Sequence, residues 1–259
     1  MYILGHWAAT RASQAFEPGA LTGDGMVALM LPDVARCHEW GYATCFDASG
    51  DADPSHRLMR AHMLGDWYVH YGSGRERIRR GWAYRTMGVF ARLYREFFET
   101  AEEAGMRPRG ASRDSVRGFS HTMVEYSIDT WVADSLPEAA EGFAAAKEAL
   151  ADLPLPTLTA TLDAAGADYP LDKLGEGARS FSRRVRAADR PQELAYRAGV
   201  KKFGLSGDSA VAYVESFIRR GMQEIPRAEF DSTFAGTARF IAEHLHPMKS
   251  PQPLAEARA

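Results

Sequence analysis

The chain has 259 residues, of which 46% are hydrophobic and 25% charged, and its formal net charge is -3 at pH 7. This length and apolar content suit a globular protein with a full hydrophobic core, while the charge gives no electrostatic basis for a nucleic-acid scaffold. The two cysteines are too few for a disulfide framework.

The N-terminal segment, residues 1–13, lacks the basic start, long apolar run and small-residue cleavage site of a signal peptide. No apolar run approaches the roughly 20 residues that a membrane-spanning helix needs. From these features we expect a cytoplasmic protein without a membrane span.

Helical spacing of apolar residues dominates the first half of the chain. A short apolar run at 25–31 ends at Pro32, and a polar loop covers residues 47–55, where Ser55 could cap the helix that follows. A loop rich in Gly and Pro is expected at 105–112. The predicted helices in this half are residues 56–71, 76–104, 114–134 and 137–151.

In the second half, residues 152–180 are predicted to be a linker because they begin with alternating Leu and Pro. Further helices are predicted at 190–203, 207–222 and 228–246. Strand-type alternation is nearly absent, and its best candidate is 155–162. The sequence therefore predicts an all-α fold, and one multi-helix domain over 1–259 accounts for it.

Two of the predicted helices carry a triplet of residues that can bind a metal. On a helix, positions i, i+4 and i+8 lie nearly above one another on one face. Each triplet could therefore present three ligands to divalent ions. The two triplets are His62, Asp66 and His70, and His121, Glu125 and Asp129.

For either helix taken alone, an ion pair or a core histidine bonded to a carboxylate also explains the spacing. Two such triplets in one chain are harder to explain in that way. Upstream, Asp33 follows Pro32 and precedes His38, and His6 lies near the N-terminus. Taken singly, Asp33 could cap a helix, His38 could be a surface residue and His6 could be buried in the first helix.

The order of these residues resembles that in the zinc-dependent phospholipase C and P1-type nuclease superfamily. Those proteins are all-helical and bind up to three zinc ions through His, Asp, His, His-x3-Asp, His and His-x3-Glu in that order. The resemblance covers roughly residues 1–130 and depends on ligand order and spacing. The matching residues here are His6, Asp33, His38, His62, Asp66, His70, His121 and Glu125.

The resemblance implies a metal-binding part at 1–135, followed by a helical part at 136–259 that could cover the site. By the resemblance, one ion would be held by Asp33, His38, His62 and Asp66, and a second by His70, His121 and Glu125. A third would be shared by His6 and Asp66, so that Asp66 bridges two ions. Asp129 has no counterpart in the series, and we expect it either to bind a metal or to orient His121.

A cluster of two or three ions suits a phosphatase or phosphodiesterase that acts on a small metabolite or a lipid-like phosphoester, since the ions activate water and hold the phosphate oxygens. Asp33 is the candidate general base, and Asp66 joins it as a catalytic residue. Zn²⁺ is the expected ion, although Fe and Mn²⁺ also suit these ligands. Arg75, Arg79 and Trp67 are candidates for substrate binding.

Solvated helix faces for the arginines and a core position for the tryptophan are the alternatives. A second basic group, Arg179, Arg183, Arg184 and Arg186, has the same two interpretations.

Two other functions stay open. A non-haem di-iron oxygenase or oxidase also uses His and carboxylate ligands in a helical bundle, but its typical Glu-x-x-His pair is missing from the two triplets. A metal-free helical binding protein would use the same residues as a structural network. The sequence leaves the oligomeric state open.

Overall fold

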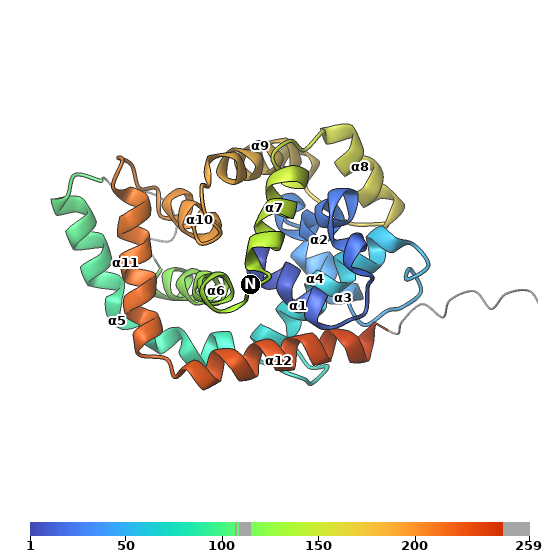
Figure 1. Ribbon diagram of the computed structural model, residues 1–259, viewed down its shortest axis with the longest axis horizontal. Coiled ribbons are helices and arrows are strands. Elements are labelled where there is room, and N and C mark those ends of the chain that lie inside the picture. Colours follow the sequence, from blue (N-terminus) through green and yellow to red (C-terminus); the bar gives the residue numbers. More distant parts are fainter. Residues whose placement is uncertain (107, 109–114, 246–259) are drawn as a thin grey trace, which may run out of the picture.

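The computed structural model describes residues 1–106, 108 and 115–245, and within this part every regular element is helical (Figure 1). This confirms the all-α class. Most of the expected loop at 105–112 lies outside the described residues. The elements are α1 (Ile3–Ala12), η1 (Pro18–Leu21), α2 (Gly23–Ala35), α3 (His38–Thr44), α4 (Pro54–Tyr71), α5 (Trp82–Glu103), α6 (Val116–Ser135), α7 (Ala139–Leu150), α8 (Leu155–Ala164), α9 (Leu171–Ala187), α10 (Glu193–Phe203), α11 (Ala210–Gln223) and α12 (Arg227–His244).

Helix α4 lies at the centre and is buried on nearly every face. It packs against α2, α12, α3, α1 and α5. Its start is capped by Asp53, whose carboxylate accepts N–H groups from Ser55 and His56, and Pro54 occupies the first turn. The cap is thus Asp53 rather than the expected Ser55. Gly72, with φ 83°, ends the helix.

Helix α6, the second predicted metal-binding helix, begins at Ser115, whose hydroxyl accepts the Gly118 N–H. It packs against α5, α1, α10 and α11. In Figure 1, α9 and α10 lie above α6, and α12 lies below it. Because α6 also contacts α1, its metal-type residues lie on the side of the N-terminal helices, where His121 and Glu125 line a cleft.

Two predictions about the chain outside these helices are wrong. Residues 152–180 are not a linker, because α8 lies within this range and α9 begins inside it. The prolines there start α8, with Pro154 at its N-cap and Pro156 in its first turn. The weak strand candidate at 155–162 is likewise part of this helix. Helix α9 buries a face at helical spacing made of Leu174, Ala178, Phe181 and Val185.

The predicted helix at 76–104 begins later, at Trp82. The preceding segment folds back over the end of α4, where the Gly81 N–H donates to the His70 carbonyl. A Cβ at Gly81 would lie 2.3 Å from the backbone of α4, so this approach requires glycine.

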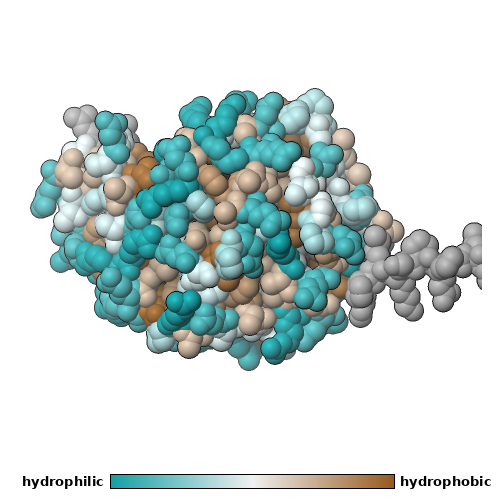
Figure 2. All heavy atoms as spheres, in the orientation of Figure 1, coloured by the Kyte–Doolittle hydropathy of each residue, from teal (hydrophilic) through white to brown (hydrophobic). Residues whose placement is uncertain are grey.

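Hydrophilic residues are spread over most of the face shown in Figure 2, with apolar ones between them. Among the described residues, no helix has the length and apolar character that a membrane crossing requires.

Candidate metal centre

Eight of the nine predicted ligands converge in the interior of the described structure. They form three groups, and within each group the ligand atoms lie within 4.8 Å of one another. His62 belongs to two of the groups, so these two are contiguous. The groups are His6, His62 and Asp66; Asp33, His38 and His62; and His70, His121 and Glu125.

Five helices bring these side chains together. Helix α4 supplies His62 and Asp66 to the first group, His62 to the second and His70 to the third through its i, i+4, i+8 face. Helices α1, α2 and α3 pack against α4, and α6 brings His121 to His70. The turn between α2 and α3 places His38 beside Asp33, with Arg36 in the left-handed region at φ 58°. As a result, His38 Nε2 lies 3.0 Å from Asp33 Oδ1.

His6 and His62 stack face to face in the core, with ring centroids 3.6 Å apart and an interplanar angle of 10°. Both residues are fully or nearly fully buried, at 1% and 0% exposure. None of their four ring nitrogens makes a well-directed hydrogen bond among the described residues, although His6 Nε2 lies near Asp66 and His62 Nε2 near Asp33. Asp33 Oδ2 likewise makes no hydrogen bond within the described part of the chain. Buried polar atoms are rarely left without a partner, since desolvating them costs free energy.

Asp66 is the carboxylate that connects the centre. Its Oδ1 lies 3.0 Å from the Met1 amino nitrogen and 3.3 Å from His6 Nε2. Its Oδ2 lies 4.0 Å from both His38 Nε2 and His62 Nε2. These contacts place Asp66 between the His6 group and the Asp33 group.

In the third group, the tautomer of His70 follows from its surroundings. His70 Nδ1 donates to the Asp66 carbonyl over 2.7 Å, because a carbonyl can only accept. In its neutral form, His70 Nε2 therefore carries a lone pair. This nitrogen lies 2.9 Å from His121 Nε2 and 3.3 Å from Glu125 Oε1. His121 Nε2 can donate to this lone pair, whereas the contact with Glu125 then sets two acceptor atoms against each other.

The protonation states of four of these residues, His6, His62, Asp66 and Glu125, suit ligation at neutral pH. Burial lowers the pKa of His62 to about 3 and also lowers the pKa of His6. Burial raises the pKa of Asp66, but the Met1 amine and His6 outweigh it, so the net pKa lies well below its usual range. The pKa of Glu125 is lowered in the same way: burial raises it, and His121 and the Met1 amine outweigh burial. Neutral imidazoles and ionised carboxylates are the ligand forms that metals bind.

The structure places Asp129 outside the three groups. Its Oδ1 accepts the N–H groups of Tyr2 and Gly5, and its Oδ2 accepts that of Leu4, at 2.8–3.1 Å. These amides start α1, so Asp129 satisfies the N-terminal donors of the helix that carries His6. The expected roles, as a ligand or as a partner of His121, are replaced by this capping role.

The three predicted substrate-binding residues do not line the cleft at this centre. Trp67 is 4% exposed, and its Nε1 donates to the Gly74 carbonyl, so it is a core residue. Arg75 lies over the Phe46 ring, and Arg79 lies over the Tyr84 ring. Of these contacts only Tyr84 reaches the cleft.

The cleft has a volume of about 700 Å³ and opens onto members of all three groups. Its other wall comes from α9, α10 and the end of α2. This wall carries four cations, and only Arg184 belongs to a basic group identified from the sequence. These are Arg36, Arg184, Lys201 and Lys202. Single lysines on exposed helix faces carry no sequence signal that distinguishes them from solvated residues.

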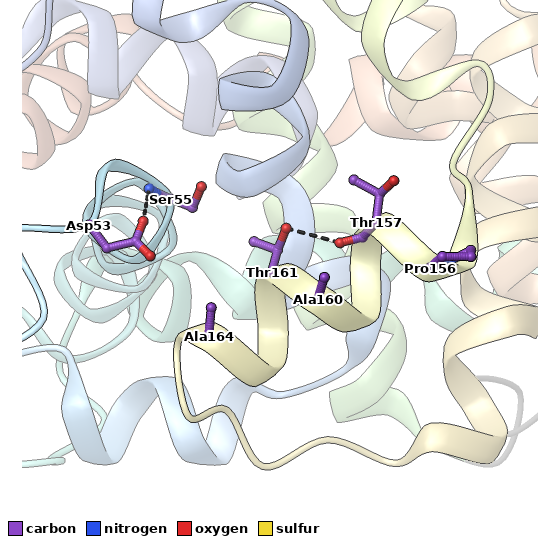
Figure 3. Close-up of a pocket in the computed structure, with 7 residues that line it drawn as sticks. All are labelled: Asp53, Ser55, Pro156, Thr157, Ala160, Thr161 and Ala164. Carbon is purple, nitrogen blue, oxygen red and sulfur yellow. Dashed lines mark hydrogen bonds between the residues drawn. The ribbon is translucent and has the colours of Figure 1, made fainter.

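A separate depression lies between the start of α4 and α8 (Figure 3). Its one carboxylate, Asp53, is used to cap α4, and Thr161 donates to the Thr157 carbonyl. The residues that line it include no other titratable group. This depression therefore offers no chemistry comparable to that of the metal-type cluster.

No protein-family model, curated protein or solved structure matches this chain significantly. The resemblance to the zinc-dependent phospholipase C and P1-type nuclease superfamily therefore stays a prediction from ligand order and spacing. The site is best interpreted from its own geometry.

Proposed function

We propose that this chain is a metal-dependent hydrolase of small phosphoesters. The observation that carries the proposal is the stacked pair His6 and His62, whose ring nitrogens have no described hydrogen-bond partner in the core. A purely structural network would be expected to satisfy these atoms. Bound cations would satisfy them instead, which also disfavours a metal-free binding protein.

The donor set fits Zn²⁺, the ion we propose, in two or three copies. Five imidazoles and three carboxylates form the groups, and zinc is bound by such nitrogen and oxygen ligands. The first group would use His6, His62 and Asp66, the second Asp33, His38 and His62, and the third His70, His121 and Glu125. When bound, the ions would supply hydroxide near neutral pH and neutralise charge on the phosphate oxygens.

The chain's own residues have separate roles in this proposal. Asp33 Oδ2 is buried without a hydrogen-bond partner, while Oδ1 is bonded to His38. Asp33 would therefore accept a proton at Oδ2 as the general base. Asp66, which lies between two groups, would bridge them. The cleft would hold the substrate against both residues, since it is lined by both.

We expect His62→Ala and His121→Ala each to remove most of the bound metal, because each deletes a ligand from a different part of the centre. Elemental analysis of the purified variants measures this, with hydrolysis of an aryl phosphate as the activity readout. His56→Ala is the control, since His56 lies outside the three groups and should leave metal content unchanged. Metal content near wild type in both ligand variants would refute the site, and iron in place of zinc would favour an oxygenase.

We also expect zinc binding to release a proton from His38. Burial lowers the pKa of His38, but the hydrogen bond and charge of Asp33 outweigh it and raise this pKa to about 9. His38 in the metal-free protein is therefore protonated at pH 7 and must lose its proton to bind a metal. Calorimetric titrations with zinc in buffers of different ionisation enthalpy count the protons released.

In that titration, His38→Gln should release about one proton fewer than wild type. His56→Gln should match wild type, since it removes a histidine outside the groups. Equal proton release by wild type and His38→Gln would show that His38 does not give up a proton to the metal.

A further inference from the structure

The cleft at the metal centre has walls of opposite charge. All of its carboxylates, Asp33, Asp66 and Glu125, belong to the metal-type groups. The other Asp, Glu, Arg or Lys side chains that line the cleft are all cations: Arg36, Arg184, Lys201 and Lys202. Two or three divalent ions would carry more charge than the three carboxylates. With these ions bound, the cleft would present positive charge on both walls.

Arg184 is held in place rather than free in solvent. Its Nε lies 3.3 Å from the Tyr2 hydroxyl, its Nη1 donates to Ser180 Oγ over 2.9 Å, and its guanidinium covers the Phe181 ring. These contacts use two of the five N–H donors of the guanidinium. No carboxylate among the described residues forms an ion pair with it, although Asp33 acts on it through charge.

The side chains of Lys201, Lys202 and Arg36 are also available to bind an anion. All three are exposed, and no ion pair or hydrogen bond of their side chains occurs among the described residues. Many other arginines of this surface pair with a carboxylate, as Arg220 does with Glu96 and Arg190 with Glu215. Unpaired cations gathered around one cleft mark a place where an anion binds.

We propose that the substrate carries a second phosphate group, which binds to Arg184, Lys201 and Lys202 while the scissile phosphate meets the metal centre. This inference depends on the proposed phosphoesterase function and narrows its substrate class to small bisphosphates. The cleft volume of about 700 Å³ lies in the range of small-molecule sites. A monophosphate would leave the cationic wall without a partner.

The test compares matched substrates on the zinc-loaded protein. The pairs are glucose 6-phosphate with glucose 1,6-bisphosphate, and adenosine 5′-monophosphate with adenosine 3′,5′-bisphosphate. In at least one pair, we expect kcat/KM for the bisphosphate to exceed that for the monophosphate by about tenfold or more. Arg184→Gln, and separately Lys201→Gln with Lys202→Gln, should lower this ratio by about tenfold.

Arg183→Gln is the matched control, because Arg183 is the exposed neighbour of Arg184 on α9 and does not line the cleft. It should leave the ratio unchanged. A ratio near one in both pairs for the wild-type protein overturns the inference, while hydrolysis of the monophosphates would still support the proposed function. A ratio that no cleft variant lowers also overturns it.

Calorimetric binding of the same four compounds separates the two proposals. If none of the four compounds is hydrolysed and the aryl phosphate is not hydrolysed either, the phosphoesterase proposal fails. Tighter binding of a bisphosphate that is lost in Arg184→Gln would still support recognition of a second phosphate by this wall. Equal binding of both members of each pair would overturn that recognition as well.

Discussion

Asp66→Asn is expected to abolish hydrolysis, with kcat/KM reduced by more than about 100-fold, because even partners behind metal ligands cost 10–100-fold when removed. The amide keeps the shape of Asp66 but loses its negative charge and one acceptor oxygen. Both oxygens are in use: Oδ1 faces the Met1 amine and His6, and Oδ2 faces His38 and His62. Elemental analysis and steady-state kinetics measure the loss.

The matched comparison is Asp129→Asn, the same change on a carboxylate that contacts backbone amides rather than the imidazoles. We expect Asp66→Asn to lose more metal and more activity than Asp129→Asn when both are assayed at a temperature where both are folded. Equal or reversed losses would reject a bridging role for Asp66.

The helical class and the central helices could be predicted because they depend on local spacing. The i, i+4, i+8 pattern on α4 and α6 survives folding unchanged, since both helices are buried and their polar stripe has to face other polar groups. Only the resemblance in ligand order predicted that His6, Asp33 and His38 would converge on that stripe. Spacing alone does not indicate that α1 and α3 pack against α4.

The failures have local causes of their own. The prolines of residues 152–180 predict a linker because proline often ends a helix, whereas Pro154 and Pro156 start α8. The contacts of Asp129 could not be predicted because the pattern of α6 gives its face but not its partner. That partner is the start of α1, which is more than 120 residues away in the chain.

The cleft wall could not be predicted for a related reason. Arg184 belongs to α9, and Lys201 and Lys202 belong to α10. Only the packing of α9 against α2 and of α10 against α6 brings them to the site. Arg75 and Arg79 follow α4 directly in sequence, yet the segment before α5 turns them onto Phe46 and Tyr84.

Asp129→Asn is expected to lower the free energy of unfolding by about 1–3 kcal/mol, because it leaves one buried backbone N–H without an acceptor. One oxygen of Asn can still accept from Tyr2 and Gly5, but its NH₂ would then face the Leu4 N–H, a donor against a donor. Burial raises the pKa of Asp129 to about 7, against the Met1 amine and the three amides. Because this pKa is raised in the folded state, ionisation of Asp129 costs stability as the pH rises from its ordinary pKa towards 7. Urea denaturation at pH 8, where the carboxylate is ionised, therefore measures the net effect of the substitution.

Asp134→Asn on the same helix is the control for that measurement. Asp134 pairs with Arg219 at the surface, over 2.8 Å with both side chains about one-third exposed, and such pairs contribute no more than about 1 kcal/mol. If Asp129→Asn cost no more than Asp134→Asn, the three amides would not depend on Asp129, and α1 would need another anchor to hold His6. We expect Asp129→Asn to lower the free energy of unfolding by more than Asp134→Asn does, while the folded variant still binds metal. That result would show that Asp129 stabilises the helix carrying His6 and is not itself a metal ligand.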